Sequence, residues 1–268
     1  MARPRVFILT FCRRMELFYG TELIFKTLRQ GFPNAEIAVV DNASIREAAA
    51  RVRELAKAND CSFAEIPLPG LPHHEFLEAT VERVGQESDD RQPLVFIDPD
   101  LCLWENCEDL EFEGLIAGKL CPAFNDDVLQ AVTMPRLHSS FLWIRSAAAL
   151  LEEIENVKRR HFDFDPFRAF SVKMGQIWVR YDTGASLYAA LSDRISLFTE
   201  REFARYDHLF CGSHFDLLEN HYRGELRELM TRIHESARSG SFESLRGIWR
   251  EQDRLWVEAY GPEERTSD

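Results

Sequence analysis

The chain has 268 residues, of which 45% are hydrophobic, and carries a formal net charge of −13 with a pI near 5.2. This length and composition suffice for one large domain with a full core. The negative charge argues against a surface that binds nucleic-acid phosphates or anionic lipid. The six cysteines show neither paired spacing nor the density of a disulfide scaffold, which favours reduced thiols and a cytoplasmic protein.

The first hundred residues alternate between apolar runs and helix-forming segments. In chain order they predict strand 5–11, an amphipathic helix to about residue 28, strand 36–41, helix 45–59, strand 63–66, helix 75–84 and strand 94–97. Such alternation implies a mostly parallel sheet with helices on both faces. The apolar run at 6–12 is too short to cross a bilayer and no small-residue cleavage site follows it. We therefore expect neither an export signal nor a transmembrane segment.

The pattern changes after residue 100. Gly114, Gly118 and Pro122 predict a loop-rich stretch, and the later elements are predicted as strand 139–145, helix 147–159, a helix at about 187–191, and two Arg- and Glu-rich helices separated at 239–241. We expect one α/β domain over 1–215, with halves of about 1–105 and 106–215. A C-terminal helical appendage over 216–268 would support a homo-oligomer.

Two carboxylates close the most apolar predicted strand. Leu94–Ile97 runs directly into Asp98-Pro99-Asp100, and α/β sheets place ligands just past the carboxyl ends of their strands. Carboxylate oxygens suit Mg²⁺ or Mn²⁺, whose remaining positions substrate phosphates can fill. The alternative is a strand-end turn in which both carboxylates accept hydrogen bonds from local backbone amides.

Polar side chains also follow the first two predicted strands, at the same edge of the sheet. Asp41 ends the second strand, where a carboxylate can contact a nucleotide's base or ribose, or can instead form a turn into the helix at 45. Thr10, Arg13 and Arg14 follow the first strand. Arginine suits bidentate phosphate contact, although an exposed arginine that opens a helix is the commoner arrangement.

These motifs, in this order, resemble nucleotide-sugar-dependent glycosyltransferases with the GT-A fold, of the family-two-like kind. The resemblance rests on the first strand–helix unit, on Val39-Val40-Asp41-Asn42-x-Ser44 and on the Asp-x-Asp strand end, within roughly the first hundred residues. It implies a Rossmann-related GT-A domain and a metal-dependent transfer of a hexosyl group from a nucleoside-diphosphate sugar to an unknown hydroxyl acceptor. Asp41 would contact the nucleoside, Asp98 the ribose and the metal, and Asp100 the metal.

The second half departs from the family pattern, because Asp182-Thr183-Gly184 stands where family-two-like members carry a Glu-Asp pair. Asp182 is the candidate base for the acceptor hydroxyl, or else the N-cap of the following helix. Many members of the fold use a late histidine as a further metal or phosphate contact. We select His214 over His208 for that role, and His138 as a contact to donor or acceptor sugar.

Two other functions fit parts of the chain. Haloacid-dehalogenase-like phosphatases also have an apolar strand ending Asp-x-Asp, but that motif normally opens their domain, and Asp100 is followed here by Leu101 and Cys102. A catalytically inactive nucleotide-sugar-binding or scaffold protein would keep the sheet and use its C-terminal helices for a partner. Donor hydrolysis distinguishes this last alternative from a transferase.

Overall fold

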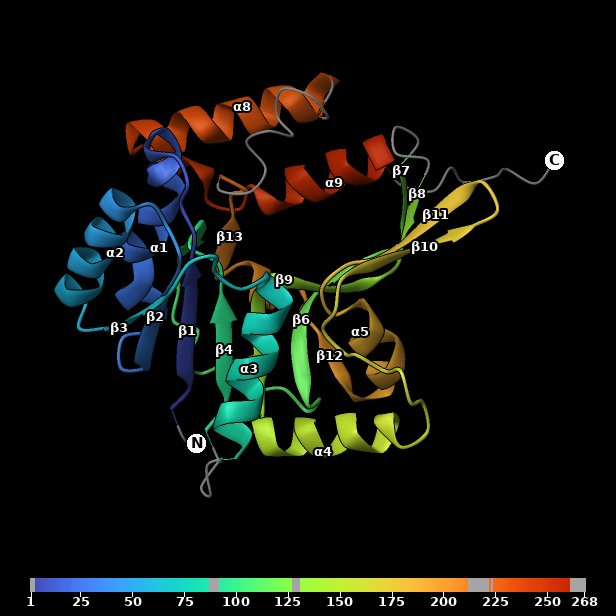
Figure 1. The fold of residues 1–268 in the computed structure, drawn as a ribbon. Helices are drawn as coiled ribbons and strands as arrows, with labels where there is room; N and C mark the ends of the chain where they lie inside the picture. Colours follow the sequence, from blue (N-terminus) through green and yellow to red (C-terminus); the bar gives the residue numbers. More distant parts are fainter. Residues whose placement is uncertain (1–2, 87–91, 127–130, 212–221, 223, 261–268) are drawn as a thin grey trace.

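A seven-stranded sheet forms the centre of the computed structural model, which describes residues 3–86, 92–126, 131–211, 222 and 224–260 (Figure 1). Its strands, in the order β12-β6-β9-β4-β1-β2-β3, are Ile195–Leu197, Ile116–Cys121, Arg136–Ile144, Leu94–Ile97, Arg5–Thr10, Glu36–Asn42 and Ser62–Ile66. All neighbours run parallel except β9, which is antiparallel to both β4 and β6. The predicted α/β fold with a mostly parallel sheet is confirmed.

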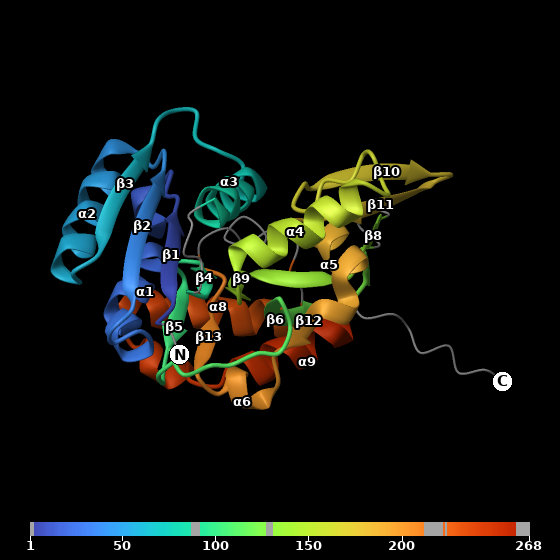
Figure 2. The same cartoon turned by 90° about the horizontal axis from the view of Figure 1, so that it is seen from below.

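Helices cover both faces of this sheet because its central strands are apolar on both sides. In β1, Val6 and Ile8 belong to the cluster under α1 (Phe18–Gly31) and α2 (Arg46–Ala58). The alternate residues Phe7 and Leu9 belong to the cluster under the helices of the other face (Figure 2). Those helices are α3 (His73–Gly85), α4 (Ala147–Lys158) and α5 (Ala185–Leu191). The predicted helices of the first half are therefore present with small shifts in their ends.

The prediction of a loop-rich stretch after residue 100 was partly wrong, since β6 lies within it. A Cβ at Gly118 would stand 3.2 Å from the Leu142 side chain and 3.3 Å from the Phe141 carbonyl oxygen. Glycine here allows β6 and β9 to approach closely and marks a strand contact rather than a turn. The other short elements are η1 (Met15–Leu17), β5 (Leu101–Leu103), η2 (Ser192–Arg194), α6 (Glu200–Phe203) and β13 (Tyr206–His208).

A second sheet, which the sequence patterns did not predict, extends away from the first. Its order is β10-β11-β8-β7, with strands Phe170–Met174, Ile177–Tyr181, Ala131–Thr133 and Phe124–Asp126. The β10–β11 hairpin projects from the body in both views (Figures 1 and 2). Trp178 is 42% exposed on this hairpin, whereas Trp143 of β9 is buried in the core.

The C-terminal helices pack on the body through a third apolar cluster. In α8 (Gly224–Ser239), Leu229 and Ile233 share that cluster with Leu23 of α1 and Trp104. The remaining C-terminal elements are η3 (Phe242–Leu245) and α9 (Trp249–Tyr260), and the predicted break at 239–241 is confirmed. No helix in the described part of the chain is both long and apolar enough to cross a membrane. A homo-oligomer formed through these helices stays a prediction.

A buried carboxylate fixes the segment between the C-terminal helices. Asp207 is fully buried and accepts hydrogen bonds from the Trp104 indole (2.6 Å), from the Gly247 N–H (2.6 Å) and from the Trp249 N–H (2.9 Å). Burial raises the pKa of Asp207 to about 6, against the effect of the three N–H donors. This carboxylate therefore joins β13 to the start of α9.

A buried histidine of α8, His234, predicts a pH dependence of stability. His234 Nδ1 lies 2.5 Å from the Tyr19 hydroxyl oxygen. Burial lowers the pKa of His234 from 6.5 to about 4, with Arg238 adding to the shift and Asp100 opposing it. Between these values the unfolded chain binds the proton more readily than the folded protein. As pH drops through this window, the contribution of His234 alone should therefore lower the free energy of unfolding by about 3 kcal/mol.

The variant His234→Asn isolates this effect, because asparagine does not titrate. Its stability deficit relative to the wild type, measured by urea unfolding, should shrink as pH falls from 6.5 to about 4. Asp207, whose pKa is raised in the folded protein, stabilises it as pH falls and so acts in the opposite direction. This contribution is the same in the wild type and the variant, and it cancels when their free energies of unfolding are subtracted. A deficit that is constant with pH would contradict this assignment.

Candidate metal centre

Three potential metal ligands meet past the carboxyl end of β4. One oxygen of Asp98, one oxygen of Asp100 and one ring nitrogen of His208 all lie within 4.8 Å of one another. His208 Nε2 is 3.0 Å from Asp100 Oδ1 and 4.0 Å from Asp98 Oδ2. Asp100 is 4% exposed. The cluster contains two hard oxygen donors and one imidazole, which suits a divalent cation such as Mn²⁺ or Mg²⁺.

Backbone pairing brings these side chains together from distant parts of the chain. The Asp98 N–H donates to the Ser140 carbonyl (2.9 Å), and the Leu209 N–H donates to the Asp100 carbonyl (3.0 Å). β13 lies antiparallel to β5 with His208 opposite Leu101. The histidine thus reaches the Asp-x-Asp strand end across a separation of 108 residues.

The charges of the cluster favour a cation. Burial raises the pKa of Asp98, the Asp100 charge raises it further, and His73 and His208 act in the opposite direction. His208 Nδ1 and His73 Nε2 are buried, and neither has a hydrogen-bond partner within the described ranges. A divalent cation would offset the repulsion between the two carboxylates, so these residues fit a metal.

Asp41 lies at the same edge, on the neighbouring strand pair. Thr10 and Asp41 face each other in the β1–β2 register, and the Thr10 hydroxyl donates to Asp41 Oδ2 at 3.0 Å. The Ser44 N–H donates to Asp41 Oδ1 at 2.9 Å, and the side chain is 1% exposed. The turn foreseen as an alternative is therefore present, and the role of Thr10 and Asp41 toward a nucleoside stays a prediction.

Substitutions at Asp41 distinguish its role in the turn from its predicted contact with a nucleoside. Asp41→Ala removes both hydrogen bonds and should destabilise the protein by about 2 kcal/mol in urea unfolding. Asp41→Asn keeps an acceptor oxygen for Ser44 and should recover most of that stability. If Asp41 also contacts a nucleoside, the well-folded Asn variant should bind nucleosides more weakly in calorimetry. Unchanged affinity would remove Asp41 from the ligand site.

Arg13 and Arg14 follow β1 at this edge, and both are exposed. The Arg13 guanidinium lies 4.8 Å from the centre of the Phe11 ring, and Arg14 Nε lies 3.9 Å from a Glu16 oxygen. Neither contact places these guanidinium groups in the metal cluster. Their contact with a diphosphate stays a prediction.

His138 lies beside the cluster. Because Phe141 of β9 pairs with Ile97 of β4, residues 136–140 extend past the carboxyl end of β4. The His138 ring centre is 5.0 Å from that of His208. Its Nδ1 accepts the Ser140 N–H at 3.1 Å, which leaves Nε2 as the N–H when the ring is neutral. His138 is thus positioned beside the candidate ligands, as a contact to a bound molecule would require.

Asp182 lies outside the metal cluster but is tied to the same extension of β9. Its Oδ2 lies 2.7 Å from Arg136 Nη2, and its Oδ1 accepts the Thr183 N–H at 2.8 Å. The alternative role of Asp182, as N-cap of the following helix, is not what the structure shows. Gly184 is the N-cap of α5, in a left-handed conformation (φ 79°) that glycine adopts without strain. The half-exposed Asp182 carboxylate lines a hollow of about 240 Å³ together with Phe170, Arg180 and Tyr181.

The histidine chosen from the sequence, His214, lies outside the described residues, and His208 is the one found in the cluster. No motif distinguishes the two, because both stand near Gly212 within seven residues of one another. His73 was also missed. It directly follows the proline-rich segment 67–72, a position that signals only a loop leading into a helix.

No protein-family model and no curated protein sequence matches this chain. Solved glycosyltransferases are similar in fold. GlyE of Streptococcus pneumoniae TIGR4 has 12% identity and a TM-score of 0.48, over 98% of this chain and 66% of GlyE. The galactosyltransferase LgtC, solved with donor and acceptor sugar analogues, has 12% identity and a TM-score of 0.46, over 92% and 99%.

A third similar structure is the mannosyltransferase PcManGT of Pyrobaculum calidifontis, solved in complex with GDP-Man and Mn²⁺. It has 12% identity and a TM-score of 0.38, over 96% of this chain and 75% of PcManGT. The chain spans slightly less than two thirds of the length of GlyE. At these scores the similarity concerns the arrangement of strands and helices alone.

Proposed function

We propose that the protein is a metal-dependent glycosyltransferase of hexosyltransferase type, acting from a nucleoside-diphosphate sugar on an acceptor hydroxyl. The observation that carries this proposal is the convergence of Asp98, Asp100 and His208 at the carboxyl edge of the sheet. Ligands of open α/β sheets bind at that edge. The chain has a net charge of −13 and would repel an anionic ligand. A diphosphate would therefore need a divalent cation in order to bind.

Each residue of the cluster has a part in donor binding. Asp98, Asp100 and His208 would hold Mn²⁺ or Mg²⁺, which supplies charge stabilisation for the departing nucleoside diphosphate. Asp98 would also contact the ribose, and Asp41, fixed by Thr10, the nucleoside. Arg13 and Arg14, which follow β1, would contact the diphosphate. His73 Nε2, which has no hydrogen-bond partner among the described residues, would offer a further polar contact near Asp98.

The acceptor half would lie along the extension of β9. His138 stands next to His208 and would contact the sugar, while Asp182 stands beyond it, paired with Arg136. Attack on the anomeric carbon releases a proton from the acceptor hydroxyl, and a carboxylate within reach takes it. We assign this role to Asp182. His214 remains the proposed additional metal contact, and the cytoplasm the proposed location, in keeping with six free thiols in reducing surroundings.

Release of nucleoside diphosphate from a panel of nucleotide sugars, with Mn²⁺, with Mg²⁺ and with a chelator, tests the proposal. Slow metal-dependent hydrolysis of one donor is expected even without an acceptor. Binding without turnover would favour the inactive binding protein. Release of inorganic phosphate from phosphate monoesters, with no effect on nucleotide sugars, would favour the phosphatase.

A further inference from the structure

The β10–β11 hairpin presents an apolar face to solvent. In its register, Phe170 lies opposite Tyr181, Val172 opposite Val179, and Met174 opposite Ile177. Since alternate residues of a strand share a face, all six side chains lie on one side of the hairpin. Exposure increases toward the tip, from 37% at Phe170 to 65% at Met174. Clustered exposed apolar side chains on one element mark an interaction site.

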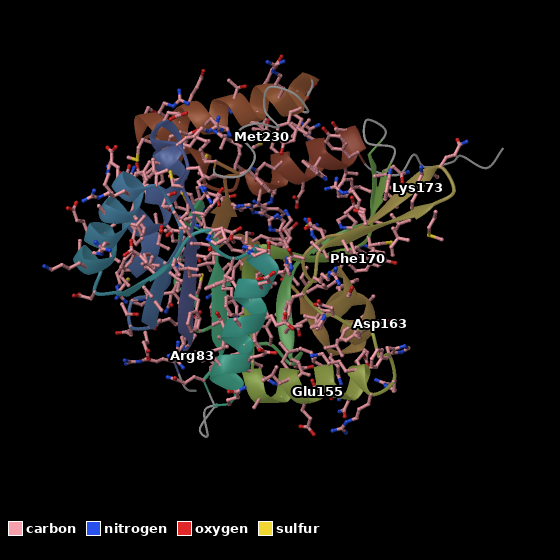
Figure 3. All side chains as sticks on the ribbon, viewed as in Figure 1. Arg83, Glu155, Asp163, Phe170, Lys173 and Met230 are labelled. Carbon is pink, nitrogen blue, oxygen red and sulfur yellow. The ribbon has the colours of Figure 1, made fainter. Side chains whose placement is uncertain are left out.

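The same element is locally cationic. Residues 170–181 contain Lys173 and Arg180 and no carboxylate, although the whole chain has a net charge of −13. Lys173 lies toward the tip and Phe170 nearer the body, as the side chains show (Figure 3). Lys173 and Trp178 share the face opposite the apolar one, with the ammonium 5.8 Å from the centre of the Trp178 ring. The hairpin therefore combines an apolar face with positive charge and an interface-favouring tryptophan.

We propose that the β10–β11 hairpin docks the protein on the surface of an anionic lipid bilayer, with Met174 and Ile177 entering the interface first. Apolar area with flanking Lys and Arg is the combination that binds such a surface. A second copy of the chain is the less favourable occupant. Pairing two hairpins through their β10 edges would bring the cations of both copies together with no carboxylate on either hairpin to offset them.

The negative charge of the chain does not prevent this contact. Each strand of the hairpin has five residues and so reaches about 16 Å. Salt screens exposed charges beyond about 8 Å at physiological ionic strength. A bilayer at the hairpin tip would therefore respond mainly to the local cations. The net charge argues against binding of anionic lipid by the surface as a whole. It does not argue against binding by this projecting hairpin.

Vesicle cosedimentation of the full chain tests the proposal without using any enzymatic activity. Wild-type protein should sediment with vesicles of phosphatidylcholine and phosphatidylserine, less with phosphatidylcholine alone, and less as salt is raised. Met174→Glu combined with Ile177→Glu should lower the partition coefficient at least about tenfold. Lys173→Gln should lower it about fivefold on the anionic vesicles and little on the neutral ones.

A matched control separates the hairpin from general charge and hydrophobicity. Phe162→Glu combined with Val257→Glu also removes two exposed apolar side chains and adds two negative charges, at positions outside the hairpin. This control should bind vesicles like the wild type. Equal binding by the control and hairpin variants, or no vesicle binding by the wild type, would overturn the proposal. So would a wild-type dimer in light scattering that only the hairpin variant converts to monomer, since that result identifies a second copy as the occupant.

Discussion

Asp100→Asn is expected to abolish metal-dependent donor binding and to lower transfer by about 10²–10³-fold, the usual effect of removing one preorganised charged contact to a developing charge. The substitution keeps an oxygen that can accept a hydrogen bond from His208 Nε2, now 3.0 Å from Asp100 Oδ1. It removes one of two neighbouring carboxylates. The variant should therefore fold normally and, without metal, be at least as stable as the wild type.

The metal dependence of stability makes this result specific. Mn²⁺ with a nucleoside diphosphate should raise the wild-type melting temperature, because a ligand of the folded state stabilises it. The same addition should leave Asp100→Asn unchanged. Asp193→Asn, at an exposed position in η2, serves as the matched control and should respond like the wild type. A retained Mn²⁺ response in Asp100→Asn would remove Asp100 from the set of ligands.

Asp182→Asn is expected to lose about 10²–10⁴-fold in transfer rate while keeping donor and metal affinity. Asparagine cannot accept the acceptor's proton at neutral pH. The effect on stability should be small, because asparagine keeps an acceptor oxygen for Arg136 and for the Thr183 N–H, and because Gly184 rather than Asp182 caps α5. A loss of transfer rate in Asp182→Asn would therefore not be caused by unfolding of α5.

The measurement for Asp182 is transfer to an acceptor under saturating donor, compared with metal-dependent donor hydrolysis by the same preparation. Loss of transfer with retained donor affinity would support Asp182 as the base that takes the proton of the acceptor hydroxyl. A near-normal transfer rate would rule out this assignment and leave Asp182 as the partner of Arg136. The transferase proposal would then depend on the metal centre.

The strands that the sequence predicted belong to the large sheet, and the most apolar of them, β4, is buried on both faces. Leu94–Ile97 is apolar throughout because α1 and α2 cover one side of the sheet and α3 and α4 the other. The strand β6 was missed because Gly118 and Lys119 interrupt its apolar run, and the glycine's role depends on β9, a partner that local sequence does not reveal. The β10–β11 hairpin was missed because its apolar residues are of the kinds that usually lie in a core. The sequence does not show that they are exposed on a projecting element.

Only those residues of the candidate site that follow a recognisable strand were predicted from the sequence. Asp98, Asp100 and Asp41 stand at strand ends, and parallel strands bring such ends to one edge. His208 reaches that edge through the pairing of two three-residue strands, β5 and β13, which carry no sequence signal of their own. The placement of His208 at the cluster therefore required the fold.

Binding of Mn²⁺ itself tests the metal centre most directly. Electron paramagnetic resonance of free Mn²⁺ can be recorded as protein is added in the presence of a nucleoside diphosphate. Wild-type protein should deplete the free-ion signal, Asp98→Asn combined with Asp100→Asn should not, and His208→Ala should weaken the depletion more than His214→Ala does. Depletion by the double variant equal to that of the wild type would contradict a metal held by Asp98, Asp100 and His208.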